Sequence, residues 1–293
     1  MNDIENPTQQ PLTPAYLLKE SYGLYGEKFW ALFRIALVPA LLAYLWRYYF
    51  RFAIRQMMVA GWIGFDSGNF ARLIATEWIN GSFYWVVNSF FFAAVATTVL
   101  GVAYKENPAV SDAFTQARAR IGALTVTALL CWTIFWMGRA VANYALTNAL
   151  NRLHLRPGFY VLETIFYTAP LLLAGLLSRL ALTVPVLMDK PTASLKEAMG
   201  TSVKKTEGWE LFFMMFLVKS AILALGLYWL ANHGLDWLWQ RHMLTQTTYP
   251  WFARALYICI AAAVESPMFI AFSVLYRDSS SSREKALSAA AIE

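Results

Sequence analysis

The chain contains 293 residues, of which 58% are hydrophobic and only 14% are charged. Soluble domains carry about 25% charged residues, so this composition excludes an ordinary soluble enzyme or nucleic-acid-binding domain. It indicates a polytopic membrane protein, and the twelve tryptophans suit a chain with several membrane interfaces. The net charge of +6 then matters less than the side of the membrane on which Lys and Arg lie.

Apolar windows of about 20 residues, the length that crosses a bilayer as a helix, occur six times. They cover residues 29–47, 83–104, 121–144, 159–187, 209–231 and 252–276. We therefore expect an all-α fold, with one membrane domain of six transmembrane helices (13–276) between an N-terminal tail (1–12) and a polar C-terminal tail (277–293). Both termini then share one side. The loops on that side hold more Lys and Arg, which predicts cytoplasmic termini.

Three of the predicted cytoplasmic segments share a pattern, because a proline and a short amphipathic stretch lead each time into an odd-numbered span. Pro14 and Pro191 begin the same spacing, Pro-x-x-x-Leu-Lys-Glu-x-x-Gly, and a weaker copy follows Pro108. Thr13 and Asn107 precede their prolines and are good helix N-caps. The sequence thus predicts three repeats of an interfacial helix plus a transmembrane hairpin. The repeat units are expected at 13–104, 107–187 and 190–276.

These short amphipathic helices have two interpretations. They lie naturally along the headgroup boundary, with an apolar side toward the lipid and Lys or Glu toward water. In the first interpretation they are elbows that set the angle at which the next helix enters the membrane. In the second they form a cytoplasmic collar that docks a protein partner or senses lipid.

Ionisable residues inside the spans are the best functional pointers in such a chain, since each costs at least about 2.5 kcal/mol in hydrocarbon. Arg34 is near enough to its interface to snorkel. Arg179, Lys219 and Glu265 are each about 15–17 Å from the predicted cytoplasmic end of their spans, at 1.5 Å per residue. We expect these three to meet at the midplane, either as an anion site or as a buried ion pair that fixes helix register.

A basic stripe follows the first span. Arg47, Arg51 and Arg55 recur at every fourth residue beside Tyr48 and Tyr49, so they fall on one face of a helix. Lipid headgroup phosphates are their natural partners. A specific lipid site and ordinary snorkelling at an aromatic belt both explain these residues.

No signature of catalysis or of a cofactor is visible in the sequence. His233, Asp236 and His242 share one loop, but their spacing is not a metal-ligand pattern, and we expect neither a metal nor a cofactor. Phosphate-binding loops and hydrolase motifs are absent. In the second span, a stripe of small residues (Ala93, Thr97 and Gly101) predicts close helix packing.

The segment from Leu17 to Trp30 (LLKESYGLYGEKFW) and the close Leu275-Tyr276-Arg277-Asp278 resemble a broad bacterial family. This family is the multi-pass proteins related to the membrane domain of glycerophosphodiester phosphodiesterases, and the segment 191–209 is similar to its other recurring element. The resemblance implies a bacterial inner-membrane location and six to eight helices. It implies no phosphodiesterase activity, because that chemistry belongs to a separate soluble barrel.

Two functions follow from these observations. In the first, the chain is a non-catalytic membrane protein that organises lipid or docks a partner through its interfacial helices. In the second, it is a carrier for an anionic or amphiphilic solute, with a site built on Arg179, Lys219 and Glu265. The two are distinguished by whether those side chains line a cavity.

Overall fold

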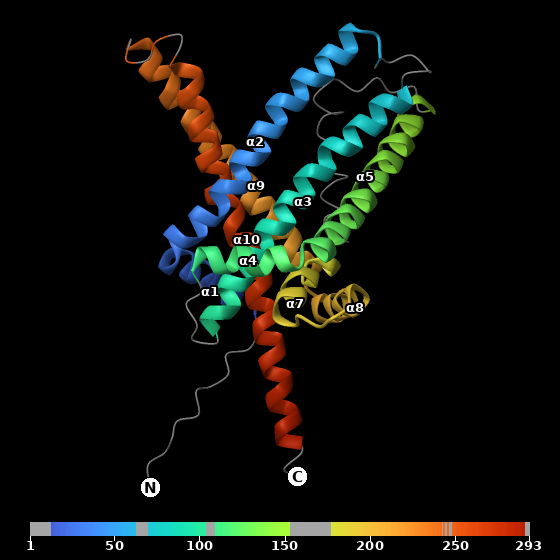
Figure 1. The fold of residues 1–293 in the computed structure, drawn as a ribbon, viewed down its shortest axis with the longest axis vertical. Coiled ribbons are helices and arrows are strands. Elements are labelled where there is room, and N and C mark those ends of the chain that lie inside the picture. Colours follow the sequence, from blue (N-terminus) through green and yellow to red (C-terminus); the bar gives the residue numbers. More distant parts are fainter. Residues whose placement is uncertain are drawn as a thin grey trace.

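The computed structural model describes residues 13–62, 70–103, 109–152, 177–241, 243, 245 and 248–290. Within these ranges the chain is all-helical and has no strand. Five long helices form the bundle seen in Figure 1, and short helices gather at its lower end. The long helices are α2 (Phe29–Val59), α3 (Phe70–Ala103), α5 (Ile121–Arg152), α9 (Glu210–Gln240) and α10 (Tyr249–Ala290).

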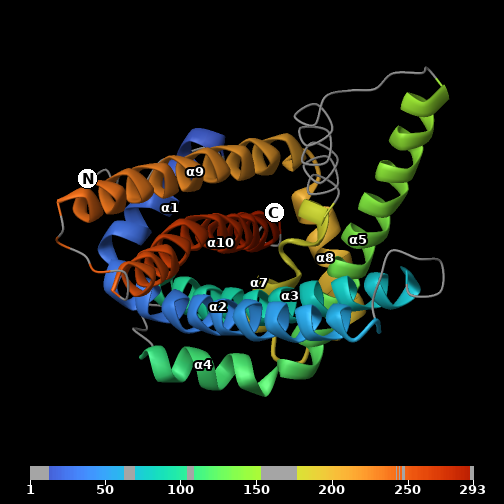
Figure 2. The same ribbon diagram turned by 90° about the horizontal axis from the view of Figure 1, so that it is seen from above.

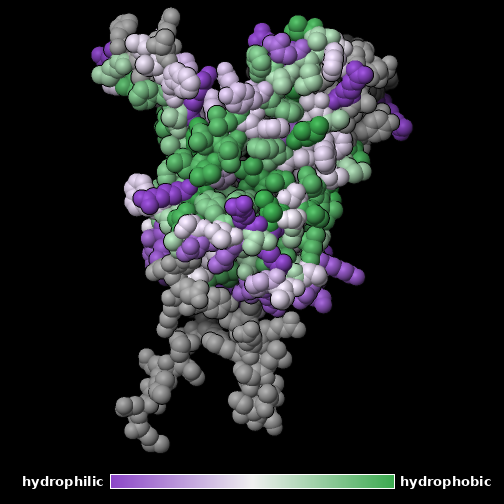
Figure 3. Space-filling view, viewed as in Figure 1, coloured by the Kyte–Doolittle hydropathy of each residue, from purple (hydrophilic) through white to green (hydrophobic). Residues whose placement is uncertain are grey.

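All five long helices are sufficiently long and apolar to cross a bilayer. On the face drawn in Figure 3, hydrophobic residues form a band across the middle of the bundle, with hydrophilic residues above and below it. By length and composition, this is the architecture of a multi-pass membrane protein. Most of the predicted span 159–187 lies outside the described residues. Its described end is not one straight helix, because a 3-10 turn, η1 (Ser178–Leu180), is followed by the short α7 (Thr183–Asp189).

Three short helices lie at the lower end of the bundle, and each precedes a long helix (Figure 1). They are α1 (Pro14–Glu27), α4 (Val110–Ala119) and α8 (Leu195–Thr206). Lys28 separates α1 from α2, and Arg120 separates α4 from α5. Between α8 and α9 the chain turns at Gly208, whose φ of +82° favours glycine. These breaks change the direction of the chain where the amphipathic pattern gives way to an apolar one.

The N-termini of the short helices follow the expected pattern only in part. Thr13 caps α1 as predicted, since its hydroxyl accepts a hydrogen bond from the Tyr16 amide (3.2 Å). Ala109, rather than Asn107, is the N-cap of α4. The third helix does not open at Pro191, because Ser194 caps it by accepting from the Glu197 amide (3.2 Å). The Ser-x-x-Glu spacing, a common N-terminal signature, was the stronger signal there.

Helix α3 is the centre of the core. Its residues 91–101 are all buried, and they pack against α10 and α7. The predicted stripe of Ala93, Thr97 and Gly101 is part of this buried run, so the prediction of close packing is confirmed. Seen from above, α10 lies between α9 on one side and the adjacent pair α2 and α3 on the other (Figure 2). Helix α9 is the most exposed long helix, with only 19% of its apolar window buried.

Helix α10 is longer than the predicted span 252–276. It continues as a helix to Ala290, and Figure 1 shows this end projecting below the bundle. The first part of the predicted polar tail (277–293) is therefore helical.

Candidate functional site

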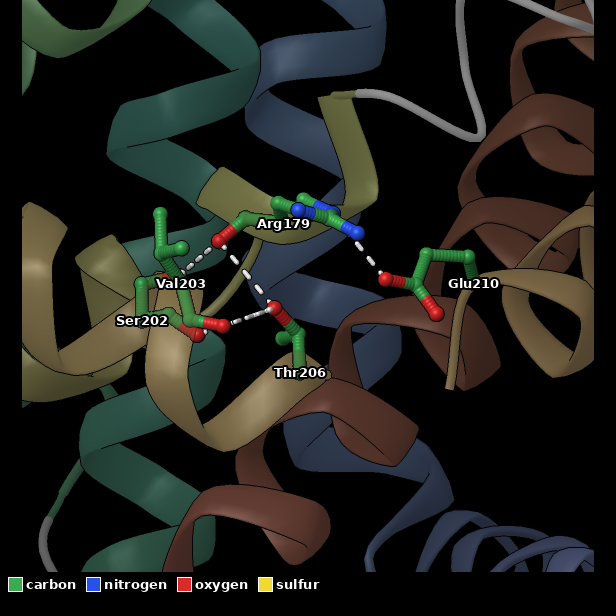
Figure 4. A network of polar contacts seen from close by, with 5 residues as sticks. All are labelled: Arg179, Ser202, Val203, Thr206 and Glu210. Carbon is green, nitrogen blue, oxygen red and sulfur yellow. Dashed lines mark hydrogen bonds and ion pairs between the residues drawn. The ribbon is translucent and has the colours of Figure 1, made fainter. Parts of the chain in front are cut away.

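The turn η1 places Arg179 beside the start of α9. The Arg179 Nε donates to Glu210 Oε1 at 3.0 Å, and the two side chains are 50% and 27% exposed. Such a half-exposed ion pair contributes little to stability, but it fixes where the guanidinium lies. Figure 4 shows Arg179 and Glu210 facing one another across the gap between the two elements.

The backbone around Arg179 is held by two hydroxyl groups of α8. Ser202 Oγ donates to the Arg179 carbonyl (2.7 Å) and accepts from the Leu182 amide (3.0 Å). Thr206 Oγ1 donates to the same carbonyl at 3.2 Å (Figure 4). A break in a helix leaves backbone groups without partners, and these hydroxyls satisfy them. The break is therefore a defined structural joint between η1 and α8.

Lys219 lies far along α9 from this joint. It follows Glu210 by nine residues, which is about 13 Å of helix. Its ammonium lies over the Tyr22 ring of α1 (5.1 Å to the centroid), and Tyr22 also stacks on Phe216 (6.3 Å). Lys219 thus contacts the short helix α1.

Arg179 does not lie beside Lys219, as the predicted midplane cluster would require. Arg179 pairs with Glu210 at the beginning of α9, while Lys219 contacts Tyr22 further along that helix. The prediction placed Arg179 by counting along a straight span, and the turn at η1 invalidates that count. Glu265 lies on α10, and its side chain is outside the described part of the structure.

A larger polar network, which we did not predict, joins α1, α7, α8 and α10 at the lower end of the bundle. Arg277 pairs with Glu20 of α1 (3.1 Å) and with its neighbour Asp278 (2.6 Å). Tyr276 donates to Asp189 of α7 at 2.7 Å, and the Lys205 ammonium lies 4.5 Å from the centre of the Tyr276 ring. The sequence shows the runs Tyr276-Arg277-Asp278 and Lys19-Glu20. It does not show that Arg277 pairs with Glu20, because the two residues are far apart in the chain.

Two tyrosines of α1 have a raised pKa, and one of them, Tyr16, lies beside this network. Burial raises the pKa of Tyr16, and the nearby carboxylates of Asp278 and Glu20 raise it further, while Arg277 opposes them. Burial alone raises the pKa of Tyr25, whose hydroxyl donates to the Ala263 carbonyl at 2.9 Å. Both hydroxyls thus remain protonated at neutral pH and act as hydrogen-bond donors.

The basic stripe on α2 lies at the opposite end of the bundle. The Arg47 guanidinium is 5.6 Å from the centre of the Tyr84 ring on α3, and Arg51 and Arg55 are exposed. Arg34, nearer the start of α2, is exposed as well. None of the four pairs with a carboxylate among the described residues.

Two cavities of about 360 and 390 Å³ lie between the helices. The first is bounded by α3, α5, η1, α7 and α10, and the second by α2 to α5. Their described lining is mainly apolar and includes neither Arg179 nor Lys219. In the described residues no His, Cys, Asp or Glu cluster could hold a metal ion. Asp236 instead accepts from the Tyr249 hydroxyl, and His242 falls outside the described part.

Comparisons of the chain with protein-family models, with curated proteins and with solved structures find no match. The family resemblance therefore stays a prediction.

Proposed function

We propose that this chain is a non-catalytic membrane protein that gathers anionic lipid at one membrane face through α1, α4 and α8. In this proposal the three helices belong to three repeat units of a six-span domain. Both termini lie on the cytoplasmic side of a bacterial inner membrane, in keeping with the resemblance to the phosphodiesterase membrane-domain family. The observation that carries the proposal is the position of the three helices at one end of an apolar bundle (Figure 1).

The side chains of the short helices support this role. In α8, Ala198 and Ser202 are buried against the bundle, whereas Lys196 and Lys204 are exposed. In α4, Ala113 and Ala117 are likewise buried while Arg118 is exposed. Exposed Lys and Arg beside a membrane attract anionic lipid by about 1 kcal/mol each. Lys19 of α1 is exposed as well, so in this proposal each of the three helices presents a cation at the depth of the headgroups.

The carrier alternative has less support. It required Arg179, Lys219 and Glu265 to share one site, and Arg179 is engaged by Glu210 instead. The described lining of the two cavities also lacks these cations.

The lipid shell of the purified protein tests the proposal. The membrane is extracted with a polymer that retains native lipid, and the anionic fraction around the protein is compared with that of the bulk membrane. We expect enrichment for wild type, a lower enrichment for Lys196→Gln with Lys204→Gln, and retention for the matched Lys→Arg pair. Equal enrichment in all three would overturn the proposal. Solute flux in proteoliposomes that falls in Lys219→Met would favour the carrier.

Docking of a protein partner at the same face is a second candidate. It is favoured by the projection of α10 below the bundle to Ala290 (Figure 1). Deleting residues 281–293 tests it: a partner captured by crosslinking in cells should be lost from the truncated chain. A partner that is still captured would exclude this projection as its docking element.

A further inference from the structure

Arg254 of α10 joins the end of the molecule that carries the basic stripe of α2. Its guanidinium carbon lies 5.6 Å from the centre of the Tyr48 ring on α2 and 5.0 Å from that of Trp251. The cation is thus held by aromatic rings from two helices. Stacking of this kind uses the face of a guanidinium and leaves its N–H edge available to an acceptor.

Arg51 lies on the same surface of α2 as Tyr48. The two residues are three apart, which makes their side chains neighbours on a helix. Arg254 above Tyr48 therefore adds a cation from α10 beside the Arg51 position. Arg51 is exposed, and Arg254 is partly buried by the rings that hold it.

The position of these two arginines along their helices corresponds to a headgroup layer. Arg51 follows the start of α2 by 22 residues, about 33 Å of helix, and Arg254 precedes Asp278 by 24 residues, about 36 Å. The hydrocarbon core of a bilayer is about 30 Å thick. Measured along their helices, both arginines are therefore about one hydrocarbon thickness from the lower end of the bundle, toward the opposite membrane surface.

Among the described residues, no carboxylate pairs with this group of cations. The ion pairs of the described residues involve Arg179 and Arg277, and neither Arg51 nor Arg254 has a carboxylate within ion-pair distance. Arg47 and Arg55 add further positive charge on the same helix. Cations gathered at one end of two neighbouring helices repel one another, and an anion between them relieves that repulsion.

We propose that Arg51 and Arg254 together bind the phosphate of one anionic membrane lipid in the angle between α2 and α10. Two N–H groups of a guanidinium match two phosphate oxygens, which makes Arg the suitable residue for such a site. The exposed Phe52 (61%) and Leu45 (40%) on α2 provide apolar surface for the acyl chains. A zwitterionic lipid would not offset the charge, so the site selects an anionic headgroup. This site is separate from the lipid-gathering face formed by α1, α4 and α8.

Titration of phosphatidylglycerol into the detergent-purified protein, followed by native mass spectrometry, tests the site. We expect wild type to bind one phosphatidylglycerol more tightly than phosphatidylcholine of equal chain length. Arg51→Gln and Arg254→Gln should each weaken that adduct about fivefold. Arg241→Gln is the matched control, because Arg241 also lies over a tryptophan, Trp237 (5.7 Å), on the neighbouring α9. It should leave the affinity unchanged.

The double variant distinguishes a shared phosphate from general attraction. If both arginines hold one phosphate, the second substitution adds less than the first, and the total loss stays below the roughly twenty-five-fold product of two independent effects. Additive losses, or an equal loss in Arg241→Gln, would overturn the proposal. So would competition by soluble glycerol phosphate as effective as that by the lipid, since it would show a free-anion site. Arg254→Lys keeps the charge and is the control for misfolding. It should bind phosphatidylglycerol more tightly than Arg254→Gln does.

Discussion

Gly81 of α3 leaves room for the side chain of Trp132 on α5. A Cβ at this position would overlap the indole ring of Trp132, whose Nε1 donates to the Trp78 carbonyl at 2.9 Å. The edge of the ring that carries Nε1 thus lies directly against the α3 backbone, and only a hydrogen atom fits between them. A single missing side chain sets the distance between two of the five membrane helices.

Gly81→Ala should therefore destabilise the protein although alanine is the better helix former. Overpacking of this kind costs about 1–3 kcal/mol. Gly226→Ala on α9 is the control, because no described atom lies within 4 Å of a Cβ there. We expect the thermal unfolding midpoint in detergent to fall for Gly81→Ala and to stay level or rise for Gly226→Ala. A midpoint at position 81 that matches the control would show that the two helices are not in close contact.

The acidity of Tyr16 gives a prediction of pH dependence. Burial, Asp278 and Glu20 raise its folded-state pKa above the ordinary 10.0. The unfolded chain thus ionises first as the pH rises, and it is stabilised relative to the folded chain. The contribution of Tyr16 is complete below pH 10 and is lost above it, up to the folded-state pKa. Tyr16→Phe should reduce the fall of the unfolding midpoint between about pH 9 and 11. An unchanged fall would contradict this assignment.

At the scale of elements, Ser202 connects α8 to the turn that carries Arg179. It donates to one backbone group of that turn and accepts from another, so a single hydroxyl satisfies both. Leu182, whose amide donates to the Ser202 hydroxyl, is fully buried. Water cannot replace the hydroxyl there, and the joint depends on this side chain.

Ser202→Ala should cost about 1–3 kcal/mol, because it leaves the buried Leu182 amide without an acceptor. Ser194→Ala removes only the N-cap of the same helix, at about 1 kcal/mol. Unfolding of both variants in detergent compares the two effects. If Ser194→Ala lowers the stability as much as Ser202→Ala, the Ser202 hydroxyl contributes no more than a helix cap, and the joint does not depend on it.

Three of the five long-helix starts could be predicted closely from the sequence, whereas α3 begins at Phe70, thirteen residues before its predicted window. The windows opening at 29, 121 and 209 match the starts of α2, α5 and α9 within one residue, because an amphipathic pattern changes there to an apolar one. Helix α2 continues to Val59, twelve residues past its predicted end, since a helix persists beyond the apolar region that a hydropathy window detects. Hydropathy marks the membrane and not the limits of the helix.

The side-chain partners at the candidate sites could be predicted less well than the helices. Arg47, Arg51 and Arg55 form an exposed stripe as their spacing predicts, but Arg254 joins them only through the crossing of α2 and α10. The partner of Arg179 was missed because η1 gives no strong sequence signal, with no glycine or proline in Ser178–Leu180. Arg179 and Glu210 are 31 residues apart in the chain. Such a pair depends on how the helices pack, and the periodicity of a sequence does not reveal that packing.

At the scale of the whole molecule, polar groups occupy the two ends of an apolar bundle. The lower end holds the three short helices and the network around Arg277, and the opposite end carries the arginines of α2 and α10. Between them, the surfaces of α2 and α9 are mostly exposed, with 22% and 19% of their apolar windows buried. Such surfaces require lipid around them, and they explain why an apolar band crosses the face shown in Figure 3.

The measurement that tests the central claim most directly is the sidedness of the three short helices. Single cysteines are placed by Lys19→Cys, Arg118→Cys and Lys204→Cys, with Arg55→Cys at the opposite end, in a background of Cys131→Ala and Cys259→Ala. All four positions are exposed. A membrane-impermeant maleimide added from one side should label the first three together and leave position 55 unlabelled. Labelling of any of the three together with position 55 would contradict a common lipid-gathering face.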